Sequence, residues 1–210
     1  AMFGRINVPL SPYLELTAFI FFFSWFAAYL LFYPLSFYVP DFVNYWFIDL
    51  PPIVFITNGE FSIILNSLSL LSLVILAPLT EEFLFPGLLL HRWIERWGYL
   101  PAIVLSSALF GIAHPDPIGA FAFGVAMSVI YLKTQNLLIP IICHALNNLA
   151  VWLLELVFLI IEGPEYYDYN LEQFQQDWAW GFGSGILCLV WFYWYLKRPH
   201  KRAVWKLPQL

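Results

Sequence analysis

Two adjacent carboxylates, Glu81 and Glu82, interrupt a long apolar stretch of the chain, "LAPLTEEFLFPGLLLHRW" (residues 76–93). An ionisable side chain in a membrane span costs at least about 2.5–3.5 kcal/mol on insertion scales, and such side chains tend to mark functional sites. Two carboxylates that are confined together titrate as one coupled pair. The pair therefore indicates a place where protons are held or moved.

Imidazole and amide side chains occur in two later apolar stretches. Phe110 and His114 are four residues apart, as are His144 and Asn148, so each pair shares one face of a helix. Asn147 points away from the second of these faces. The pattern predicts three helices that direct polar groups into one interior pocket. Each pair taken alone is also explained by hydrogen bonds between helices.

The combination of these groups suits hydrolysis. A carboxylate paired with an imidazole can activate water as a general base, and a second imidazole with an amide can donate hydrogen bonds to an oxyanion. These are the groups needed to hydrolyse a peptide bond without a covalent intermediate. Ser106 and Ser107 precede Phe110 by one turn, but no acid is obviously placed to orient a base for them.

A metal-dependent hydrolase is an alternative, because Glu and His side chains also ligate zinc or manganese. Asn148 in place of a third strong ligand makes this alternative less attractive, and we predict neither a metal nor a cofactor. The H-E-x-x-H zinc helix and the G-x-S-x-G elbow are both absent from the sequence. Glu155 has no polar companion on its helix, and we expect it to lie at a membrane interface.

The composition is that of a membrane protein. Of the 210 residues, 61% are hydrophobic and only 11% are charged, whereas about a quarter are charged in soluble domains. The mean hydropathy is +0.75. Because about 20 apolar residues cross a hydrocarbon core of roughly 30 Å, the chain contains several candidate spans. We predict one all-α domain, residues 1–210, a polytopic transmembrane bundle of about six spans with interfacial amphipathic segments.

The apolar stretches set the expected boundaries. The predicted spans and their connections are 14–38, an interfacial segment 39–52, 61–79 with an amphipathic continuation to 98, then 99–113, 117–132, 137–160 and 178–196. Pro86 and Gly87 are expected to bend or interrupt the second span. The predicted catalytic core covers about residues 61–160. Cys143 and Cys188 lie in apolar stretches without a spacing pattern, and we interpret them as free buried residues.

The charges are unevenly distributed along the chain. Five of the nine Lys and Arg residues lie within 197–210, while the segment 161–177 holds five acids and no Lys or Arg. Cytoplasmic loops of membrane proteins carry an excess of positive charge. We therefore predict an integral multi-pass membrane protein with a cytoplasmic C-terminus. Next to a span, the basic tail favours contact with membrane lipids, and we predict no nucleic-acid partner.

Three motifs in this order resemble those of the CAAX-processing and bacteriocin-processing (CPBP) intramembrane glutamic endopeptidases, which include the type II CAAX prenyl endopeptidases. The motifs are Glu81-Glu82-x-x-x, Phe110-x-x-x-His114 and His144-x-x-x-Asn148. The resemblance covers about residues 70–150. It implies that Glu81 is the general base and that His114 holds and polarises the water. It also implies that His144 and Asn148 form an oxyanion hole, that Glu82 supports the site and that Phe110 packs under His114.

One position departs from the family pattern. The first motif of the family ends in Arg, and this chain has Pro86 there. An arginine can pair with carboxylates and keep one of them ionised, whereas proline supplies no charge. The sequence therefore predicts an intramembrane endopeptidase acting on a peptide or protein, with lipidated substrates among the candidates. The alternative is a catalytically silent scaffold or assembly factor of the same fold.

Overall fold

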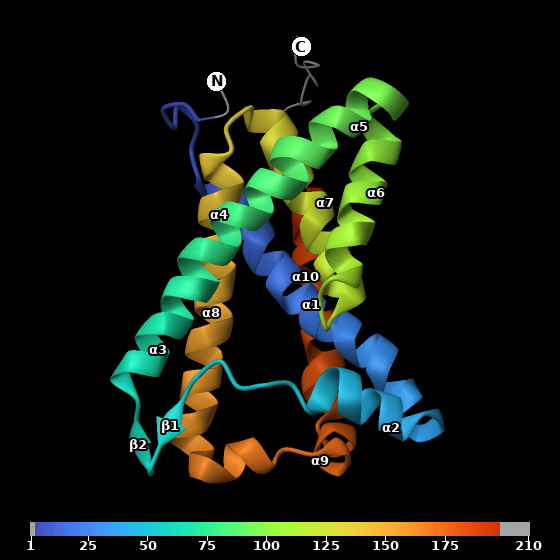
Figure 1. Cartoon of the computed structure of the whole chain (residues 1–210). Helices are drawn as coiled ribbons and strands as arrows, with labels where there is room; N and C mark the ends of the chain where they lie inside the picture. The colour runs from blue at the N-terminus through green and yellow to red at the C-terminus, as the bar shows by residue number, and fades with distance from the viewer. Residues whose placement is uncertain (1–2, 198–210) are drawn as a thin grey trace.

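The computed structural model, which describes residues 3–197, is a bundle of long helices. Five helical segments in this part of the chain are long and apolar enough to cross a membrane, and a sixth apolar helix is shorter. These six segments are α1 (Ser11–Tyr38), Ile63–Trp97, α6 (Tyr99–Ile112), α7 (Pro117–Thr134), α8 (Leu138–Glu162) and α10 (Trp178–Lys197). The all-α membrane bundle and the approximate positions of its spans are confirmed (Figure 1).

The second span is one continuous helical segment that alternates between two geometries. It consists of α3 (Ile63–Leu70), η2 (Leu71–Leu76), α4 (Ala77–Glu82), η3 (Phe83–Leu89) and α5 (Leu90–Trp97), in which η2 and η3 are π-helical. A π-helix pairs residues five apart and often occurs at functional sites. Pro86 lies inside η3, so the expected interruption takes the form of a π-helical segment through which the helix continues.

The helices α6 and α7 form a tight pair beside the site. A turn of four residues joins them, and Asp116 caps α7 by accepting a hydrogen bond from the backbone N–H of Gly119 at 3.1 Å. A Cβ atom on Gly124 would lie only 3.1 Å from the Cα atom of Ser107. The absence of a side chain at Gly124 therefore allows the two helices to approach closely.

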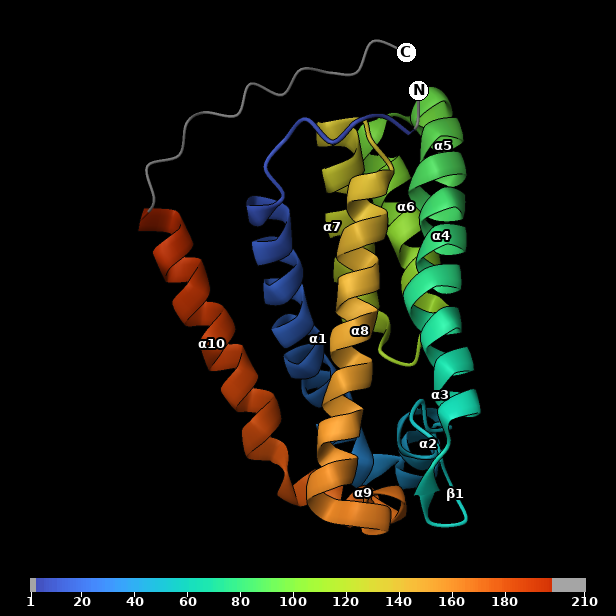
Figure 2. The ribbon, with the colours of Figure 1, turned by 90° about the vertical axis from the view of Figure 1, so that its left-hand side faces the viewer.

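The view in Figure 2 shows the order of the remaining helices across the bundle. α10 lies at one side, α1 separates it from α7 and α8, and the segment from α3 to α5 lies at the opposite side. The last helix packs on α1 through aromatic pairs such as Phe19 and Trp191, whose ring centroids are 4.5 Å apart. The segment that carries Glu81 therefore meets α8, α6 and α7 rather than α10.

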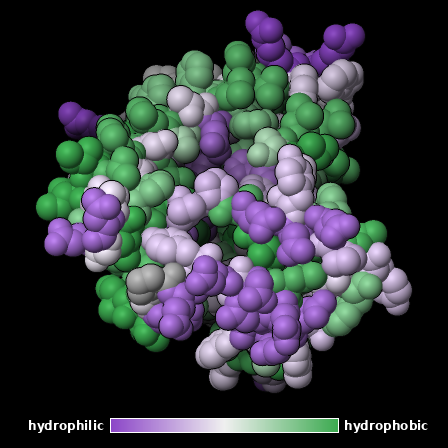
Figure 3. Space-filling model, turned by 60° about the horizontal axis from the view of Figure 1, so that its bottom comes forward, coloured by the Kyte–Doolittle hydropathy of each residue, from purple (hydrophilic) through white to green (hydrophobic). Residues whose placement is uncertain are grey.

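Short elements cover one end of the bundle. They are α2 (Pro40–Val43), η1 (Asn44–Ile48), the antiparallel hairpin β1 (Ile56–Thr57) and β2 (Glu60–Phe61), η4 (Gly163–Asp168) and α9 (Leu171–Gln176). The hairpin was not predicted from the sequence. Seen from this end, hydrophilic residues surround a hollow in the surface (Figure 3).

Glu155 of α8 forms hydrogen bonds to the segment that precedes the hairpin. Its Oε1 atom accepts hydrogen bonds from the backbone N–H groups of Ile53 and Val54 at 2.8 and 2.9 Å. The Trp152 indole donates to the Ile53 carbonyl at 3.0 Å. Glu155 therefore anchors a connecting segment, a more specific role than the interfacial position expected from the sequence.

The described basic residues lie at the other end of the bundle. Arg5 precedes α1, Arg92 and Arg96 lie in α5, and Lys133 and Lys197 lie in the last turns of α7 and α10. The basic tail, residues 198–210, lies outside the described residues. Cys143 and Cys188 are both buried and free, which confirms their interpretation as small apolar side chains.

Candidate active site

Glu81 and Glu82 lie at the end of α4, immediately before the π-helical segment η3. Consecutive residues on a helix point about 100° apart, so the two carboxylates face different neighbours. The Glu81 side chain is 28% exposed and the Glu82 side chain is 2% exposed. The first side chain is therefore partly exposed although its Oε2 atom is buried, while the second is enclosed by protein.

His144 connects the two carboxylates from the first part of α8. Its Nδ1 atom lies 2.7 Å from Glu82 Oε1, and its Nε2 atom lies 3.8 Å from Glu81 Oε2. When Glu82 is ionised, Nδ1 carries the proton of this hydrogen bond, because a carboxylate can only accept. The remaining nitrogen of the neutral ring then directs a lone pair toward Glu81.

His114 approaches Glu81 from the opposite side, at the end of α6. Its Nδ1 atom lies 2.6 Å from the Phe110 carbonyl oxygen, and its Nε2 atom lies 3.8 Å from Glu81 Oε2. A carbonyl oxygen only accepts, so Nδ1 is the protonated nitrogen. The Phe110 ring stacks on the imidazole with centroids 4.3 Å apart. The motif spacing of four residues thus fixes both the orientation and the tautomer of His114.

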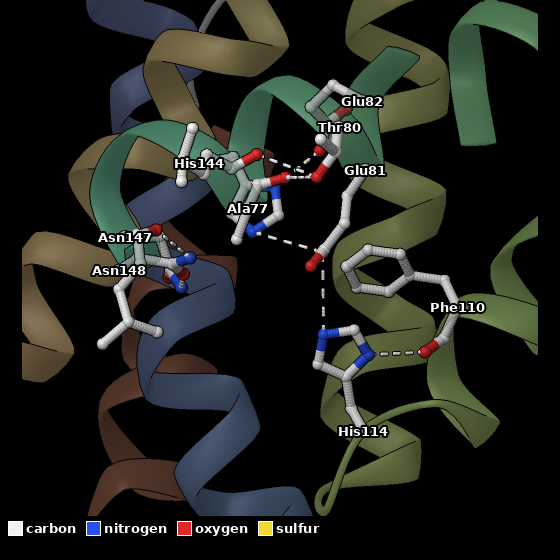
Figure 4. A network of polar contacts seen from close by, with 11 residues as sticks. Ala77, Thr80, Glu81, Glu82, Phe110, His114, His144, Asn147 and Asn148 are labelled. Atoms are coloured by element: carbon white, nitrogen blue, oxygen red, sulfur yellow. Dashed lines mark hydrogen bonds and ion pairs between the residues drawn. The ribbon is translucent and has the colours of Figure 1, made fainter. Parts of the chain in front are cut away.

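Three acceptor atoms therefore converge in the close-up view (Figure 4). Oε2 of Glu81 is 3.8 Å from the Nε2 atoms of both His114 and His144, and it has no hydrogen-bond partner in the protein. A separation of 3.8 Å is too long for a direct hydrogen bond. A molecule with two O–H donors and a nucleophilic oxygen, such as water, suits this position.

The side chains of the site differ in their exposure. The side chains of Glu81 and His114 are 28% and 32% exposed, whereas that of His144 is 4% exposed. Phe123 of α7 covers the His144 ring, with the centroids 4.8 Å apart. The exposed part of the site therefore lies at Glu81 and His114, and its enclosed part at His144.

Asn148 lies one turn beyond His144 but bonds to a different partner. Its Nδ2 atom donates to the carbonyl oxygen of Leu73 at 2.9 Å, and its Oδ1 atom lies 3.4 Å from Asn147 Nδ2. Leu73 is in the π-helical segment η2. Asn148 thus ties α8 to the helix that carries Glu81, and no described hydrogen bond joins it to the carboxylates or imidazoles.

Sequence reasoning missed the backbone groups that take part in the site. Carbonyl groups of Leu73 and Phe110 hold Asn148 and His114. The expected pairing of Phe110 with His114 was correct for the rings, but the carbonyl contact was not foreseen. A side-chain pattern carries no direct signal for such backbone contacts.

The Glu and His side chains of the site are not arranged as a metal centre. Among residues 3–197, no three or more His, Cys, Asp or Glu side chains are arranged to hold a metal ion. The separations of 3.8 Å around Glu81 Oε2 leave the two Nε2 atoms and the carboxylate directed at a shared space. A hydrogen-bonded water fits the ring tautomers set by Phe110 and Glu82.

Residues 63–150 match the family model described as type II CAAX prenyl endopeptidase Rce1-like. This segment is similar to the Rce1-like type II CAAX prenyl endopeptidases. All three motifs lie inside it, so the resemblance inferred from them is confirmed. The Rce1-like segment also contains Ser106 and Ser107, and it ends before the anchor residue Glu155.

Relatives of the Rce1-like segment occur among bacterial membrane proteins. The membrane-embedded CAAX protease MroQ of Staphylococcus aureus is 31% identical over 93 residues, which is 40% of this chain and 37% of MroQ. An uncharacterized 24.3 kDa protein of Escherichia coli is 34% identical over 85 residues, 37% of this chain and 39% of the relative. YdiL of Bacillus subtilis, named provisionally as a membrane peptidase, is 28% identical over 85 residues, 39% of this chain and 35% of YdiL.

The chain matches less than two fifths of the length of each of these relatives. No solved structure matches it. The comparisons therefore support a membrane endopeptidase family. The catalytic residues and the substrate are proposed separately.

Proposed function

We propose that this protein is an intramembrane endopeptidase in which Glu81 activates water for attack on a peptide bond. The observation that carries the proposal is the placement of Glu81 Oε2 at 3.8 Å from Nε2 of both His114 and His144. The family of the segment 63–150 supports the same class of reaction. In this proposal the catalytic core covers about residues 61–160 of a single transmembrane domain.

The first step is proton transfer to Glu81. A water molecule between the carboxylate and the imidazoles donates one hydrogen bond to Glu81 and another to His114. Its oxygen attacks the carbonyl carbon of the substrate while a proton passes to the carboxylate. The product is a tetrahedral intermediate with a negative oxygen and a protonated Glu81.

The Glu82–His144 pair supplies a cation for that oxygen. Glu82 accepts from Nδ1 at 2.7 Å, and a buried carboxylate in this position stabilises the imidazolium form of the ring, in which Nε2 has taken a proton from solvent before the attack and keeps it through the cycle. The Nε2–H group of the imidazolium then donates toward the oxyanion. Collapse of the intermediate transfers the proton from Glu81 to the departing amine and restores the carboxylate.

Asn148 has one amide hydrogen committed to the Leu73 carbonyl. An amide nitrogen carries two hydrogens, so the second can assist the oxyanion. Asn148 would then serve two purposes, holding η2 against α8 and donating to the substrate.

The substrate in this proposal is a peptide or protein segment at the membrane, and lipidated segments are among the candidates. Membrane lipids surround the exposed apolar side chains of the bundle. The end that carries the described Lys and Arg residues is proposed to face the cytoplasm, which places Lys197 and the chain beyond it on that side.

A catalytically silent scaffold is the second candidate, because Pro86 occupies the position of the motif arginine and is buried. The first experiment is cleavage of quenched peptides by the full chain in liposomes, with Glu81→Gln as the test and Glu95→Gln as the control. Glu95 is an exposed carboxylate on α5 of the same span. Cleavage that is lost only in Glu81→Gln supports the protease.

A chelator arm accompanies this assay. Activity that survives chelation supports activation of water by Glu81, while activity that is lost and then restored by zinc or manganese supports the metal-dependent alternative. Absence of cleavage in the native chain, with binding of the same peptides retained, supports the scaffold.

A further inference from the structure

A small cavity lies behind Glu82, on the side away from Glu81. It has a volume of about 10 Å³ and is lined by residues of α4, η3, α6 and α7, among them Glu82, Pro86, Ser107 and Gly124. Most of the lining is apolar, with side chains such as Phe85, Phe110 and Met127, and polar groups come from Glu82 and the serines. A cavity of roughly this size holds one water molecule where polar partners face it. The cavity is separate from the converging acceptors, because Glu82 turns its other oxygen toward His144.

Two buried polar atoms in this wall have no partner in the protein. Glu82 Oε1 is bonded to His144, but Glu82 Oε2 and Ser107 Oγ have no hydrogen-bond partner. Both residues are 1% exposed. Burial of polar groups without partners is unfavourable, and natural structures commonly satisfy such groups with an ordered water.

The neighbouring hydroxyl of Ser106 differs in this respect. Its Oγ atom lies 3.2 Å from the carbonyl oxygen of Ile103 in its own helix, and it donates there. Ser107, by contrast, is held against α7, where Gly124 has no side chain to occupy the space. A Cβ atom on Gly124 would lie 3.3 Å from Ser107 Oγ.

We propose that this cavity binds one water molecule that donates to Glu82 Oε2 and accepts from Ser107 Oγ, so that Ser107 is a positioning residue for the Glu82–His144 pair. The water holds Glu82 Oε2 in place. The orientation of the carboxylate, and with it the hydrogen bond from His144 to Oε1, is thereby fixed. Ser107 then acts on His144 without touching it. The catalytic consequence rests on the proposed protease function, but the water site does not.

Pro86 explains why such a water is needed in this chain. The family motif places an arginine at this position, and its guanidinium can donate to a carboxylate. Proline has no side-chain donor, and Pro86 lines the same cavity as Glu82, whose Oε2 atom has no hydrogen-bond partner in the protein. A serine hydroxyl and a water therefore supply the polar contacts to Glu82 that a proline cannot.

The ring nitrogens of His144 provide a test that does not depend on activity. The full chain is labelled with ¹⁵N-histidine in nanodiscs, and His144→Gln assigns the resonances. Ser107→Ala is expected to shift the His144 Nδ1 resonance and weaken its one-bond coupling to hydrogen. Ser184→Ala is the control, since Ser184 is buried and its hydroxyl donates to the Gly181 carbonyl. An unchanged His144 spectrum in Ser107→Ala would overturn the positioning role.

A high-resolution structure of the native chain tests the water directly. The expected result is one density peak at about 2.7–3.2 Å from both Glu82 Oε2 and Ser107 Oγ. A dry cavity would overturn the water site, even if Ser107→Ala changed activity. In the cleavage assay Ser107→Ala is expected to lower kcat roughly tenfold with KM unchanged. If the native chain cleaves nothing, the protease proposal fails while the spectrum and the density still decide this inference.

Discussion

Glu82 and His144 form a hydrogen bond of 2.7 Å between side chains that are 2% and 4% exposed. The contact joins α4 to α8 in the interior of the bundle. A buried polar group that loses its partner costs about 1–3 kcal/mol, and a charged one costs more. The pair therefore stabilises the fold. It also makes His144 Nδ1 the hydrogen-bond donor and leaves Nε2 facing Glu81.

Glu82→Gln separates these two roles. The amide retains the size of the side chain, but it supplies no charge for an imidazolium and can present a donor to Nδ1, which selects the wrong tautomer. We expect kcat to fall by about 100-fold or more, whereas the midpoint of thermal unfolding changes little. Glu82→Ala should lower both. Peptide cleavage and a thermal melt in the same detergent measure the two effects, and normal activity in Glu82→Gln would remove Glu82 from the site.

His114→Ala is expected to affect activity far more than stability. Its side chain is 32% exposed, and its ring contacts are the Phe110 carbonyl and the Phe110 ring. The free energy of unfolding should change by about 1 kcal/mol or less, while kcat should fall by roughly 100-fold because the water loses one of its two acceptors. His91→Ala is the matched control, since that imidazole bonds to Tyr131 in a different part of the bundle. Equal loss of activity in both variants would contradict a local role for His114.

Glu155→Ala should loosen the segment before the hairpin without removing the carboxylate and imidazole contacts. Its Oε1 atom accepts from two backbone N–H groups, those of Ile53 and Val54, and hydrogen bonds to a charged group are worth about 1.5–3 kcal/mol each. Faster hydrogen exchange at these two amides is the expected result. Glu162→Ala, which removes an exposed carboxylate at the end of α8, serves as the control. Unchanged exchange in Glu155→Ala would show that the hydrogen bonds to the Ile53 and Val54 carbonyl groups hold the segment without Glu155.

The loop end of the bundle should weaken at alkaline pH. Burial, together with the nearby carboxylates of Glu155 and Glu162, raises the pKa of Tyr166 to about 12. The folded protein thus retains a proton that the unfolded chain releases near pH 10. The stabilisation is fully present below pH 10 and is lost as the pH rises toward 12. Thermal melts from pH 8 to 12 should show this decline in the native chain and a smaller one in Tyr166→Phe; equal declines would contradict it.

The sequence predicted the spans because hydropathy is a property of whole segments. It also predicted a pocket lined by Glu81, His114, His144 and Asn148, since i, i+4 spacing and apolar surroundings are visible in residue types. The structure brings the first three together but directs Asn148 to the Leu73 carbonyl. The sequence did not predict the π-helical segments, the Asn148–Leu73 contact or the anchoring of Ile53 by Glu155. These depend on backbone groups that become partners only after distant segments meet, and backbone groups carry no residue-specific signal.

The positions of His114 and His144 along the bundle axis were the least predictable feature of the site. Upright helices would separate His114 and His144 by roughly 10 Å along the bundle, from the rise of 1.5 Å per residue. In the structure both Nε2 atoms are 3.8 Å from one oxygen of Glu81. The short helix α6 ends at Ile112 and breaks before Pro117, so the His114 ring reaches the site from a turn inside the bundle. Tilt and helix ends are set by packing, which residue spacing does not describe.

Pro86→Arg decides between an active enzyme and a silent scaffold. The arginine would bring a guanidinium to Glu82 Oε2, which has no partner in the protein, but the adjoining cavity is only about 10 Å³. Overpacking in a well-packed core costs about 1–3 kcal/mol, and we expect a lower unfolding midpoint without a gain in kcat. Pro86→Ala is the control for loss of the proline ring. If the native chain were inactive and Pro86→Arg cleaved peptides, the proline would be what silences the site, and the present role of the protein would be binding. If the native chain cleaves and Pro86→Arg is slower, the site works with a serine and a water where the family motif has an arginine.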